Sequence, residues 1–283
     1  MKVITLVSEM QSISKKLRFE GKTIGFVPTM GYLHEGHLSL VRASKSDCDV
    51  TVVSIFVNPI QFGPKEDLSK YPRDFERDKK LLEKEGVDFI FYPTEQEMYP
   101  KGFSTTINVE GVTKNLCGAS RPGHFRGVTT VVGKLFNIVS PDKAYFGQKD
   151  YQQLITIKKM VKDLNFPIEI VGMPIVREKD GLAMSSRNTY LNAEERVSAL
   201  CLYKSIILAK QLIADGERNV ENILKSIEQL IKNTPFTKID YIKFCDPETL
   251  EYIEEGEIKG RILLALAVFV GNTRLIDNAI LEV

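Results

Sequence analysis

Two histidines three residues apart, His34 and His37, lie where a glycine-broken turn leads into a helical apolar pattern. An apolar, β-rich run at 23–28 precedes them, and Gly31 and Gly36 allow the backbone to turn tightly. Such a helix start gathers unpaired backbone N–H groups and the positive end of the helix dipole. Two imidazoles on one face of the first turn can each donate a hydrogen bond to an oxyanion. The pattern therefore predicts an anion site that suits a triphosphate better than a carbonyl.

Two other interpretations of this histidine pair stay open. Taken alone, such a pair more often belongs to a capped helix with two surface histidines. The chain has three histidines, however, and His34, His37 and His124 all lie in Gly/Pro-flanked turns, which favours function. Zinc is a weaker competitor, because no carboxylate or cysteine falls at a typical third-ligand spacing and Gly36 stands where a metalloprotease helix would continue.

A second strand-to-helix junction carries a lysine. Gly147 lets the backbone approach a ligand closely, and Gln148 and Lys149 follow it, the lysine as a point charge beside a helix N-terminus. Asp150 is a plausible helix cap, and Gln153 falls on the same helix face one turn later. Taken alone, this stretch is explained about equally well as an ordinary helix cap without a function.

A third stretch, residues 184–188, follows Asp180 and Gly181 and supplies two hydroxyls and a guanidinium. On a glycine-hinged loop these groups resemble a phosphate clamp, and a solvated charged loop is the equal alternative. The 147–153 and 184–188 stretches follow successive predicted strands. Since the carboxyl ends of such strands form the ligand-binding edge of an α/β sheet, their joint occurrence favours function.

Two loops offer further polar groups. The turn at 58–64 follows a buried strand and contains Asn58 and Gln61. The loop at 118–127 contains Arg121 and Arg126, and a solvated connection with incidental arginines explains it equally well.

Composition bounds the class of protein. The 283 residues, 43% of them hydrophobic, are enough for a sizeable core, and a formal net charge of +1 gives no global basic field for nucleic acid or an anionic membrane. No signal peptide and no run of membrane-spanning length is evident, so we expect a cytoplasmic protein without nucleic-acid or membrane partners. The cysteines are too scattered for a metal motif and suit reduced thiols; they are Cys48, Cys117, Cys201 and Cys245. Of these, only Cys117 lies in a glycine-containing loop.

The elements that position these groups alternate between strands and helices. Apolar spacing predicts helices within 1–21 and at 74–85, 129–138 and 151–164, and strands at 49–57, 87–92, 103–108, 144–146 and 168–176. The alternation predicts a doubly wound, Rossmann-like α/β domain over 1–176. Beyond it, helices at 193–214 and 220–232 and strands at 239–244 and 262–270 predict a smaller α+β domain over 177–283.

Six separated motifs, taken in order, resemble the pantothenate synthetase family. They begin at Pro28, Phe56, Tyr71, Arg121, Phe146 and Met184, and read PTMGYLHEGH, FVNPIQF, YPR, RPGHF, FGQKDYQQ and MSSRN. The histidine turn and the MSSR loop taken singly are also similar to those of the wider HxGH nucleotidyltransferase superfamily. Tyr32 stands where the family often has a small residue.

The resemblance implies an ATP-dependent ligase of coenzyme A biosynthesis, which joins pantoate to β-alanine through a pantoyl adenylate and releases AMP and pyrophosphate. It also implies Mg²⁺ with the ATP, from ligands that the sequence does not identify, and a homodimer. The catalytic groups would be His34, His37, Lys149 and Arg187, with His37 a candidate acid for the leaving group. The nucleotide would be held by Met30, Gly31, Tyr32, Leu33, His34, Glu35, Gly36, His37, Gly147, Gln148, Lys149, Asp150, Val176, Met184, Ser185, Ser186 and Arg187.

Gln61 and Gln153 would hold pantoate, because amides can bind hydroxyl and carboxylate oxygens alike. Asn58 is a further substrate candidate, and Arg121 and Arg126 are candidates for the β-alanine carboxylate or pyrophosphate. The glycine-hinged loop 180–188 is our candidate for the element that shields the adenylate from water.

Two rival functions belong to other classes. A nucleotidyltransferase acting on a phosphorylated metabolite would share the histidines and the MSSR loop, but would need another cation for the added phosphate. A non-catalytic nucleotide-binding module would keep the glycine turns without requiring Lys149 and Arg187 at the phosphates.

Overall fold

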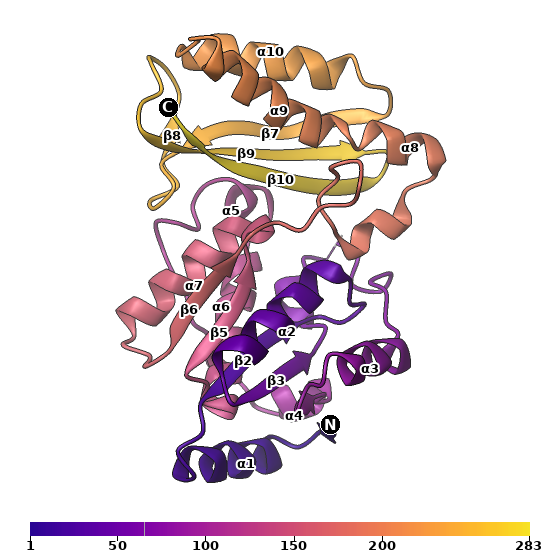
Figure 1. Cartoon of the computed structure of the whole chain (residues 1–283), viewed down its shortest axis with the longest axis vertical. Coiled ribbons are helices and arrows are strands. Elements are labelled where there is room, and N and C mark those ends of the chain that lie inside the picture. Colours follow the sequence, from indigo (N-terminus) through magenta and orange to yellow (C-terminus); the bar gives the residue numbers. More distant parts are fainter. Residues whose placement is uncertain (65) are drawn as a thin grey trace. The chain divides into compact units, whose positions relative to one another are not determined.

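A computed structural model describes residues 1–64 and 66–283, which form two compact units (Figure 1). The first comprises Met1–Thr113, Arg121–Gln148 and Gln153–Pro174, and the second comprises Lys114–Ser120, Lys149–Gln152 and Ile175–Val283. Two short segments that precede residue 175 thus belong to the second unit. The single domain boundary that we expect between 176 and 177 stays a prediction.

The first unit is built on a six-stranded parallel sheet with the order β1-β4-β3-β2-β5-β6. Its strands are β1 (Lys2–Ile4), β2 (Ile24–Thr29), β3 (Val50–Ile55), β4 (Phe89–Phe91), β5 (Lys143–Gly147) and β6 (Glu169–Met173). From β2 the chain proceeds outward through β3 and β4, and then returns to place β5 and β6 on the other side. The strand order therefore reverses between β2 and β5, which is where doubly wound sheets bind ligands.

Helices cover both faces of this sheet, because successive side chains of each strand point to opposite sides. Phe26 and Val52 pack in a cluster with α1, α6 and α7, while Val27 and Val53 pack in another with α2 and α3. These helices are α1 (Val7–Phe19), α2 (Glu35–Asp47), α3 (Phe75–Lys84), α6 (His124–Val139) and α7 (Tyr151–Asp163). Shorter elements are α4 (Glu95–Met98), α5 (Cys117–Ser120) and the 3-10 turns η1 (Pro59–Gln61), η2 (Gln148–Asp150) and η3 (Ser186–Tyr190).

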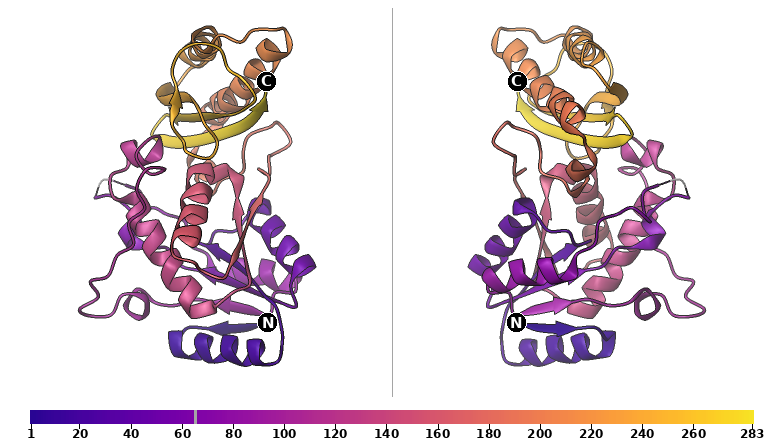
Figure 2. Two further views of the ribbon diagram at one scale, coloured as in Figure 1. Left: turned by 90° about the vertical axis from the view of Figure 1, so that its left-hand side faces the viewer. Right: turned by 90° about the vertical axis from the view of Figure 1, so that its right-hand side faces the viewer.

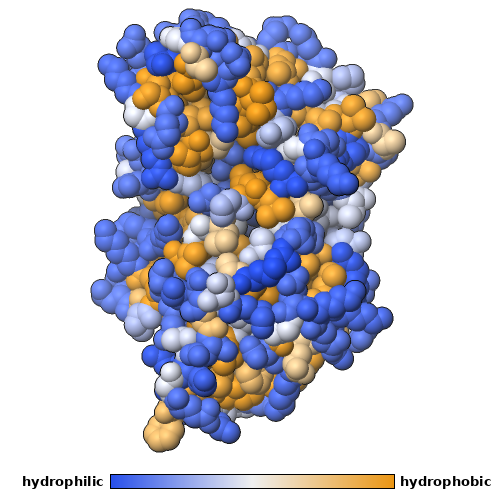
Figure 3. Space-filling view, viewed as in Figure 1, coloured by the Kyte–Doolittle hydropathy of each residue, from blue (hydrophilic) through white to orange (hydrophobic). Residues whose placement is uncertain are grey.

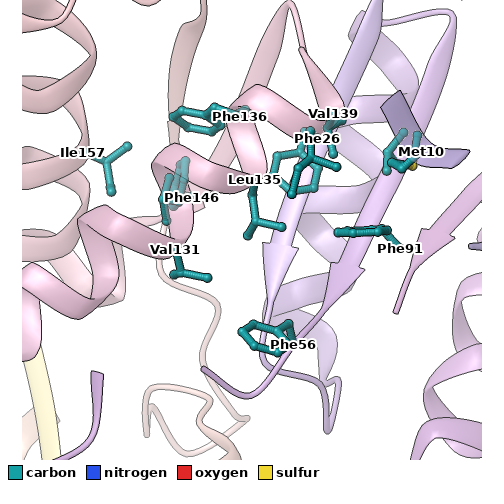
Figure 4. Close-up of a cluster of buried hydrophobic side chains, with 14 of the residues drawn as sticks. Met10, Phe26, Phe56, Phe91, Val131, Leu135, Phe136, Val139, Phe146 and Ile157 are labelled. Carbon is teal, nitrogen blue, oxygen red and sulfur yellow. The ribbon is translucent and has the colours of Figure 1, made fainter. Parts of the chain in front are cut away.

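Aromatic contacts hold α6 against the sheet (Figure 4). The ring of Phe136 lies edge-on to Phe26 and to Phe146, each with its centroid 6.5 Å away. All three side chains are buried, and burying one such side chain stabilises a fold by roughly 1.5–3 kcal/mol. Helix α6 is thereby fixed on the sheet, and its N-terminal turn has a defined place beside η1.

The second unit contains a four-stranded antiparallel sheet with the order β10-β9-β7-β8. Its elements are α8 (Ala193–Ser198), α9 (Cys201–Ala214), α10 (Val220–Lys232), β7 (Thr237–Cys245), β8 (Tyr252–Ile253), β9 (Arg261–Val270) and β10 (Thr273–Glu282). Helices α9 and α10 lie on one side of this sheet (Figure 2), where Ile206 and Ile227 pack against Leu264 and Leu266.

The doubly wound α/β class with a smaller second unit is confirmed. The strand expected at 103–108 is wrong, since those residues pair with no strand of the described chain. Instead, the Ile107 N–H donates to Thr130 Oγ1 at 3.0 Å, and the Ile107 carbonyl accepts from Thr129 Oγ1 at 2.7 Å. Side chains of α6 thus take the place of a neighbouring strand for both backbone groups of Ile107.

The helix expected at 193–214 is two helices, α8 and α9, and β1, β8 and β10 were not anticipated. Among residues 1–64 and 66–283, Ala193–Ala214 is the one helical stretch long and apolar enough to cross a membrane, contrary to our expectation of none. Cys201, Ile206 and Ile213 of α9 are nevertheless buried in the core of the second unit. On the face shown in Figure 3, hydrophilic residues alternate with small hydrophobic patches.

Candidate functional site

The reversal of strand order brings two of the predicted stretches to one edge of the first sheet. Strands β2 and β5 are paired in parallel, so their carboxyl ends lie at the same edge. Residues 30–37 follow β2, and Gly147 and Gln148 lie at the end of β5. Asn58 and Gln61 follow the neighbouring strand β3. The sheet therefore gathers these predicted residues at its ligand-binding edge.

The turn after β2 needs left-handed backbone. Gly31 has φ of +83° and Tyr32 has φ of +50°, and the first of these favours glycine. The Gly31 N–H donates to Thr29 Oγ1 at 3.1 Å, and that hydroxyl donates to the Ser54 carbonyl at 2.8 Å. Strand β3 thus helps to fix the start of the turn.

A buried carboxylate of α3 holds the same turn, and sequence reasoning missed it. Asp78 is 1% exposed and accepts hydrogen bonds from the N–H groups of Tyr32 at 2.6 Å and Leu33 at 2.8 Å. Burial raises the pKa of Asp78, although the N–H groups of Leu33 and Tyr32 and the charge of Arg77 oppose that rise. Arg77 also donates to the Leu33 carbonyl at 2.8 Å. The sequence did hold a signal for a buried carboxylate: Asp78 stands four residues before Leu82, on the apolar face of the same helix.

The two histidines cap helix α2. His34 Nδ1 accepts from the Gly36 N–H at 3.2 Å, and His37 Nδ1 accepts from the His34 N–H at 3.3 Å. A neutral imidazole that accepts at Nδ1 carries its proton on Nε2, so each ring has Nε2–H as its donor. The ring centroids are 4.1 Å apart. Capping therefore fixes which nitrogen of each ring can donate to an anion.

Gln61 is buried within a polar network of the first unit. Its Oε1 accepts from Asn58 Nδ2 at 3.0 Å, and its Nε2 lies 3.2 Å from the sulfur of Met30. Asn58 Oδ1 in turn accepts from the hydroxyl of Tyr99 at 2.7 Å. The predicted pair Asn58 and Gln61 is thus joined, and Tyr99, which the sequence did not single out, belongs to the same network.

Arg121 pairs with a carboxylate of its own unit. Its Nε and Nη2 donate to the two carboxylate oxygens of Glu66 at 2.8 and 2.6 Å, and Nη1 lies 3.1 Å from His124 Nε2. Burial raises the pKa of Glu66, but the hydrogen bond and charge of Arg121 outweigh it and leave the pKa lowered. The role predicted for Arg121, on the β-alanine carboxylate or on pyrophosphate, stays a prediction, as does that of Arg126, whose side chain is exposed.

Part of the predicted 147–153 stretch belongs to the first unit. An added Cβ at Gly147 would meet no atom within 4 Å, so packing does not require glycine there. Open space at Gly147 is consistent with a ligand that approaches its backbone. Gln153 lies half-buried in the first turn of α7.

Lys149 and the MSSR loop belong to the second unit, where one small pocket joins them. Lys149, Ser185, Asn188 and Asp277 are among the residues that line it. The Lys149 carbonyl accepts from Asn278 Nδ2 at 2.8 Å, and its ammonium lies 4.0 Å from the Asp150 carboxylate.

The loop before Ser185 is fastened to β10. The Met184 N–H donates to the Val176 carbonyl at 3.0 Å, which closes the loop at its base. Arg177 bonds both oxygens of the Asp277 carboxylate at 2.7 and 2.9 Å. Ser185 Oγ accepts from the Arg187 N–H at 3.2 Å and so begins η3, where Ser186 is buried.

Cys117 is buried in α5 of the second unit. Its sulfur lies 3.3 Å from the hydroxyl of Tyr241 and 3.6 Å from both terminal nitrogens of Arg274. Arg274 is bound to Asp240, which also accepts from Ser120 at 3.0 Å. Cys117 is therefore part of a packed polar cluster, and all four cysteines are free thiols, as we expect.

Comparisons with known proteins add an independent observation. A family model described as pantoate-beta-alanine ligase matches residues 2–280. A pantothenate synthetase of Caldicellulosiruptor saccharolyticus is 64% identical over 100% of both chains, and one of Moorella thermoacetica is 58% identical over 100% of this chain and 99% of its own.

Solved structures agree with the sequence relatives. A pantoate-beta-alanine ligase of Thermus thermophilus is 46% identical, with a TM-score of 0.93 over 99% of both chains. One from Francisella tularensis, in complex with beta-gamma ATP and beta-alanine, is 36% identical, with a TM-score of 0.80 over 99% of this chain and 97% of that one.

Proposed function

This chain belongs to the pantoate-beta-alanine ligase family, and we propose how its residues divide the work of that reaction. The enzyme condenses pantoate with β-alanine at the expense of ATP to give pantothenate, AMP and pyrophosphate. The observation that supports our assignment most is the reversal of strand order between β2 and β5, beside which the histidine turn lies.

The chemistry makes positioning and charge neutralisation the main tasks. A carboxylate oxygen of pantoate attacks the α-phosphorus of ATP, the bond from that phosphorus to the bridging oxygen breaks, and pyrophosphate leaves. The β-alanine amine then attacks the acyl carbon, and AMP and a proton leave. Because both nucleophiles belong to the substrates, the protein needs no nucleophile of its own.

We assign ATP to the turn and to the first turn of α2. The two Nε2–H groups of His34 and His37, beside the positive end of the α2 dipole, would face the phosphates, because the N–H groups of His34, Gly36 and His37 already bond within the turn. His37 is also our candidate acid for the leaving pyrophosphate. Asp78 would act indirectly, because it fixes the backbone of Tyr32 and Leu33. The side chain of Glu35 pairs with Arg42, so its backbone is the part assigned to ATP.

Cationic side chains would neutralise the phosphates. Lys149 supplies a point charge and Arg187 a planar guanidinium, which suits bidentate contact with phosphate oxygens. Ser185 and Ser186 would add hydroxyl donors. The remaining nucleotide assignments are Gly147, Gln148, Asp150, Val176 and Met184. The loop 180–188 is proposed to shield the adenylate.

We assign pantoate to Gln61 and Gln153, with Asn58 as support for Gln61. Neutral amides can bind hydroxyl and carboxylate oxygens without pairing the nucleophile with a full positive charge. Arg121 and Arg126 stay candidates for the β-alanine carboxylate or for pyrophosphate.

Mg²⁺ is proposed as a companion of ATP. Within residues 1–64 and 66–283, no group of three or more histidine, cysteine, aspartate or glutamate side chains could hold a metal ion. That donor set does not fit an ion caged by protein, whereas Mg²⁺ commonly binds substrate phosphates and water. We propose further that the enzyme is cytoplasmic and homodimeric.

The mechanism is tested by separating the half-reactions. With pantoate and ATP alone, rapid-quench analysis should show an enzyme-bound pantoyl adenylate before β-alanine is added. Pantoate labelled with ¹⁸O in its carboxylate should transfer one labelled oxygen to AMP. Label in pyrophosphate, or in phosphate with ADP, would mean that another phosphoryl transfer activates the acid. Turnover of phosphorylated acceptors would instead favour the nucleotidyltransferase alternative.

Alanine at Gln61 or Gln153 should weaken pantoate binding about tenfold and leave ATP binding nearly unchanged, because each change removes hydrogen bonds to one substrate only. Calorimetry with each ligand separately measures both affinities. An equal loss for both ligands would indicate a structural role for the turn and the helix.

A further inference from the structure

The backbone of Gln61 is held from one side by the start of α6. A Cβ on Gly127 would lie 2.4 Å from the Ile60 carbonyl oxygen and 2.5 Å from the Gln61 Cα, so only glycine allows α6 to lie this close to η1. The Gly127 carbonyl accepts from Asn58 Nδ2 at 3.1 Å. The place of Gln61 therefore depends on helix α6 as well as on its own turn.

His124 makes the directional contact between them. It is 9% exposed, and its Nδ1 lies 2.9 Å from the Gln61 carbonyl oxygen. A carbonyl can only accept, so Nδ1 carries the proton and donates. Nε2 faces the Arg121 guanidinium, which can only donate, so this nitrogen accepts. Two partners of opposite kind thus fix one neutral tautomer of the ring.

Arg121 is itself immobilised. Both oxygens of Glu66 take its Nε–H and Nη2–H groups, and the side chains of the pair are only 16% and 24% exposed. A bidentate pair of this kind fixes the plane of the guanidinium, and with it the direction of Nη1 toward His124. Glu66, Arg121 and His124 thus form a chain that ends on the backbone of Gln61.

We propose that His124 is a positioning residue for pantoate, which orients Gln61 through the Nδ1–H to carbonyl hydrogen bond while Glu66 and Arg121 hold its ring. This inference rests on the proposed role of Gln61 in pantoate binding. The fixed carbonyl sets the direction of the Gln61 peptide, and Asn58 and Met30 then hold the amide at the end of the side chain.

Two amide substitutions separate the two ring nitrogens. In His124→Asn the side-chain N–H lies near the Nδ1 position and can still donate to Gln61, whereas in His124→Gln it lies near the Nε2 position and cannot. We expect His124→Gln to raise the KM for pantoate about tenfold, the effect of one lost hydrogen bond, with the KM for ATP and the melting temperature little changed. His124→Asn should stay within about threefold of the parent enzyme. Asn137→Ala, an exposed change on the same helix, is the matched control and should change neither KM.

Gln61→Ala, measured alongside, separates the two claims. If it raises the pantoate KM and His124→Gln does not, the positioning role is wrong and the role of Gln61 stands. If Gln61→Ala leaves that KM unchanged, the proposed pantoate site is wrong, and this inference with it. Equal impairment by Asn and Gln, or a parallel rise of both KM values with early melting, would also overturn the inference. Should the histidine variants not fold, Glu66→Gln should raise the pantoate KM about threefold, and an unchanged value would overturn it.

Discussion

Replacing Lys149 with alanine is expected to slow adenylate formation at least about a hundred-fold, because deleting one group that stabilises transition-state charge typically costs about 3 kcal/mol. The melting temperature should barely change. The lysine ammonium lies 4.0 Å from the carboxylate of Asp150, and the side chains are 19% and 54% exposed; an ion pair this long with an exposed partner contributes little to stability.

Single-turnover adenylate formation and thermal unfolding measure the two effects on the same preparation. Lys143→Ala is the matched control, since Lys143 lies at the start of β5, near carboxylates of Asp47 and Glu169, and has no assigned role. It should keep the parent rate. A Lys149→Ala enzyme that melts early yet forms adenylate at the normal rate when folded would contradict a phosphate role for this lysine.

The fold was largely predictable because the strands and helices of a doubly wound sheet each have a recognisable local sequence pattern. Strand β3 is buried on both faces, so its sequence is a run of β-branched residues interrupted only by Ser54. The apolar period of α10 also predicted both of its bounds, Val220 and Lys232. The turn before His34 could likewise be predicted from adjacent residues, because Gly31 allows its left-handed backbone. Such features need no knowledge of distant residues.

What the sequence did not reveal depends on contacts between distant segments. Asp78 bonds Tyr32, 46 residues away in the sequence, and Arg121 pairs with Glu66, 55 residues away. No local sequence pattern marks either pair. The run at 103–108 has the alternation of a strand, but Thr129 and Thr130 of α6 bond the backbone of Ile107 within it. Membership of 114–120 in the second unit similarly depends on Cys117, Tyr241 and Arg274, which meet only in the folded chain.

The two histidines could serve the cap of α2, the reaction, or both. His37 Nδ1 accepts from the His34 N–H, so part of its role is to cap α2. The loss of one such cap typically costs about 1 kcal/mol of stability. Simple truncation of His37 would remove the cap and the Nε2–H together, and would not distinguish the two roles.

Asparagine and glutamine at this position do distinguish them. His37→Asn keeps an acceptor near Nδ1 for the His34 N–H but has no group that reaches the Nε2 position. We expect it to melt like the parent enzyme and to form adenylate about a hundred-fold more slowly, because it lacks the donor assigned to the phosphates. In His37→Gln the amide N–H lies near the Nε2 position, so this variant should form adenylate roughly tenfold faster than His37→Asn. Single-turnover rates beside melting curves measure both, and full activity in His37→Asn would mean that the histidine serves only to cap the helix.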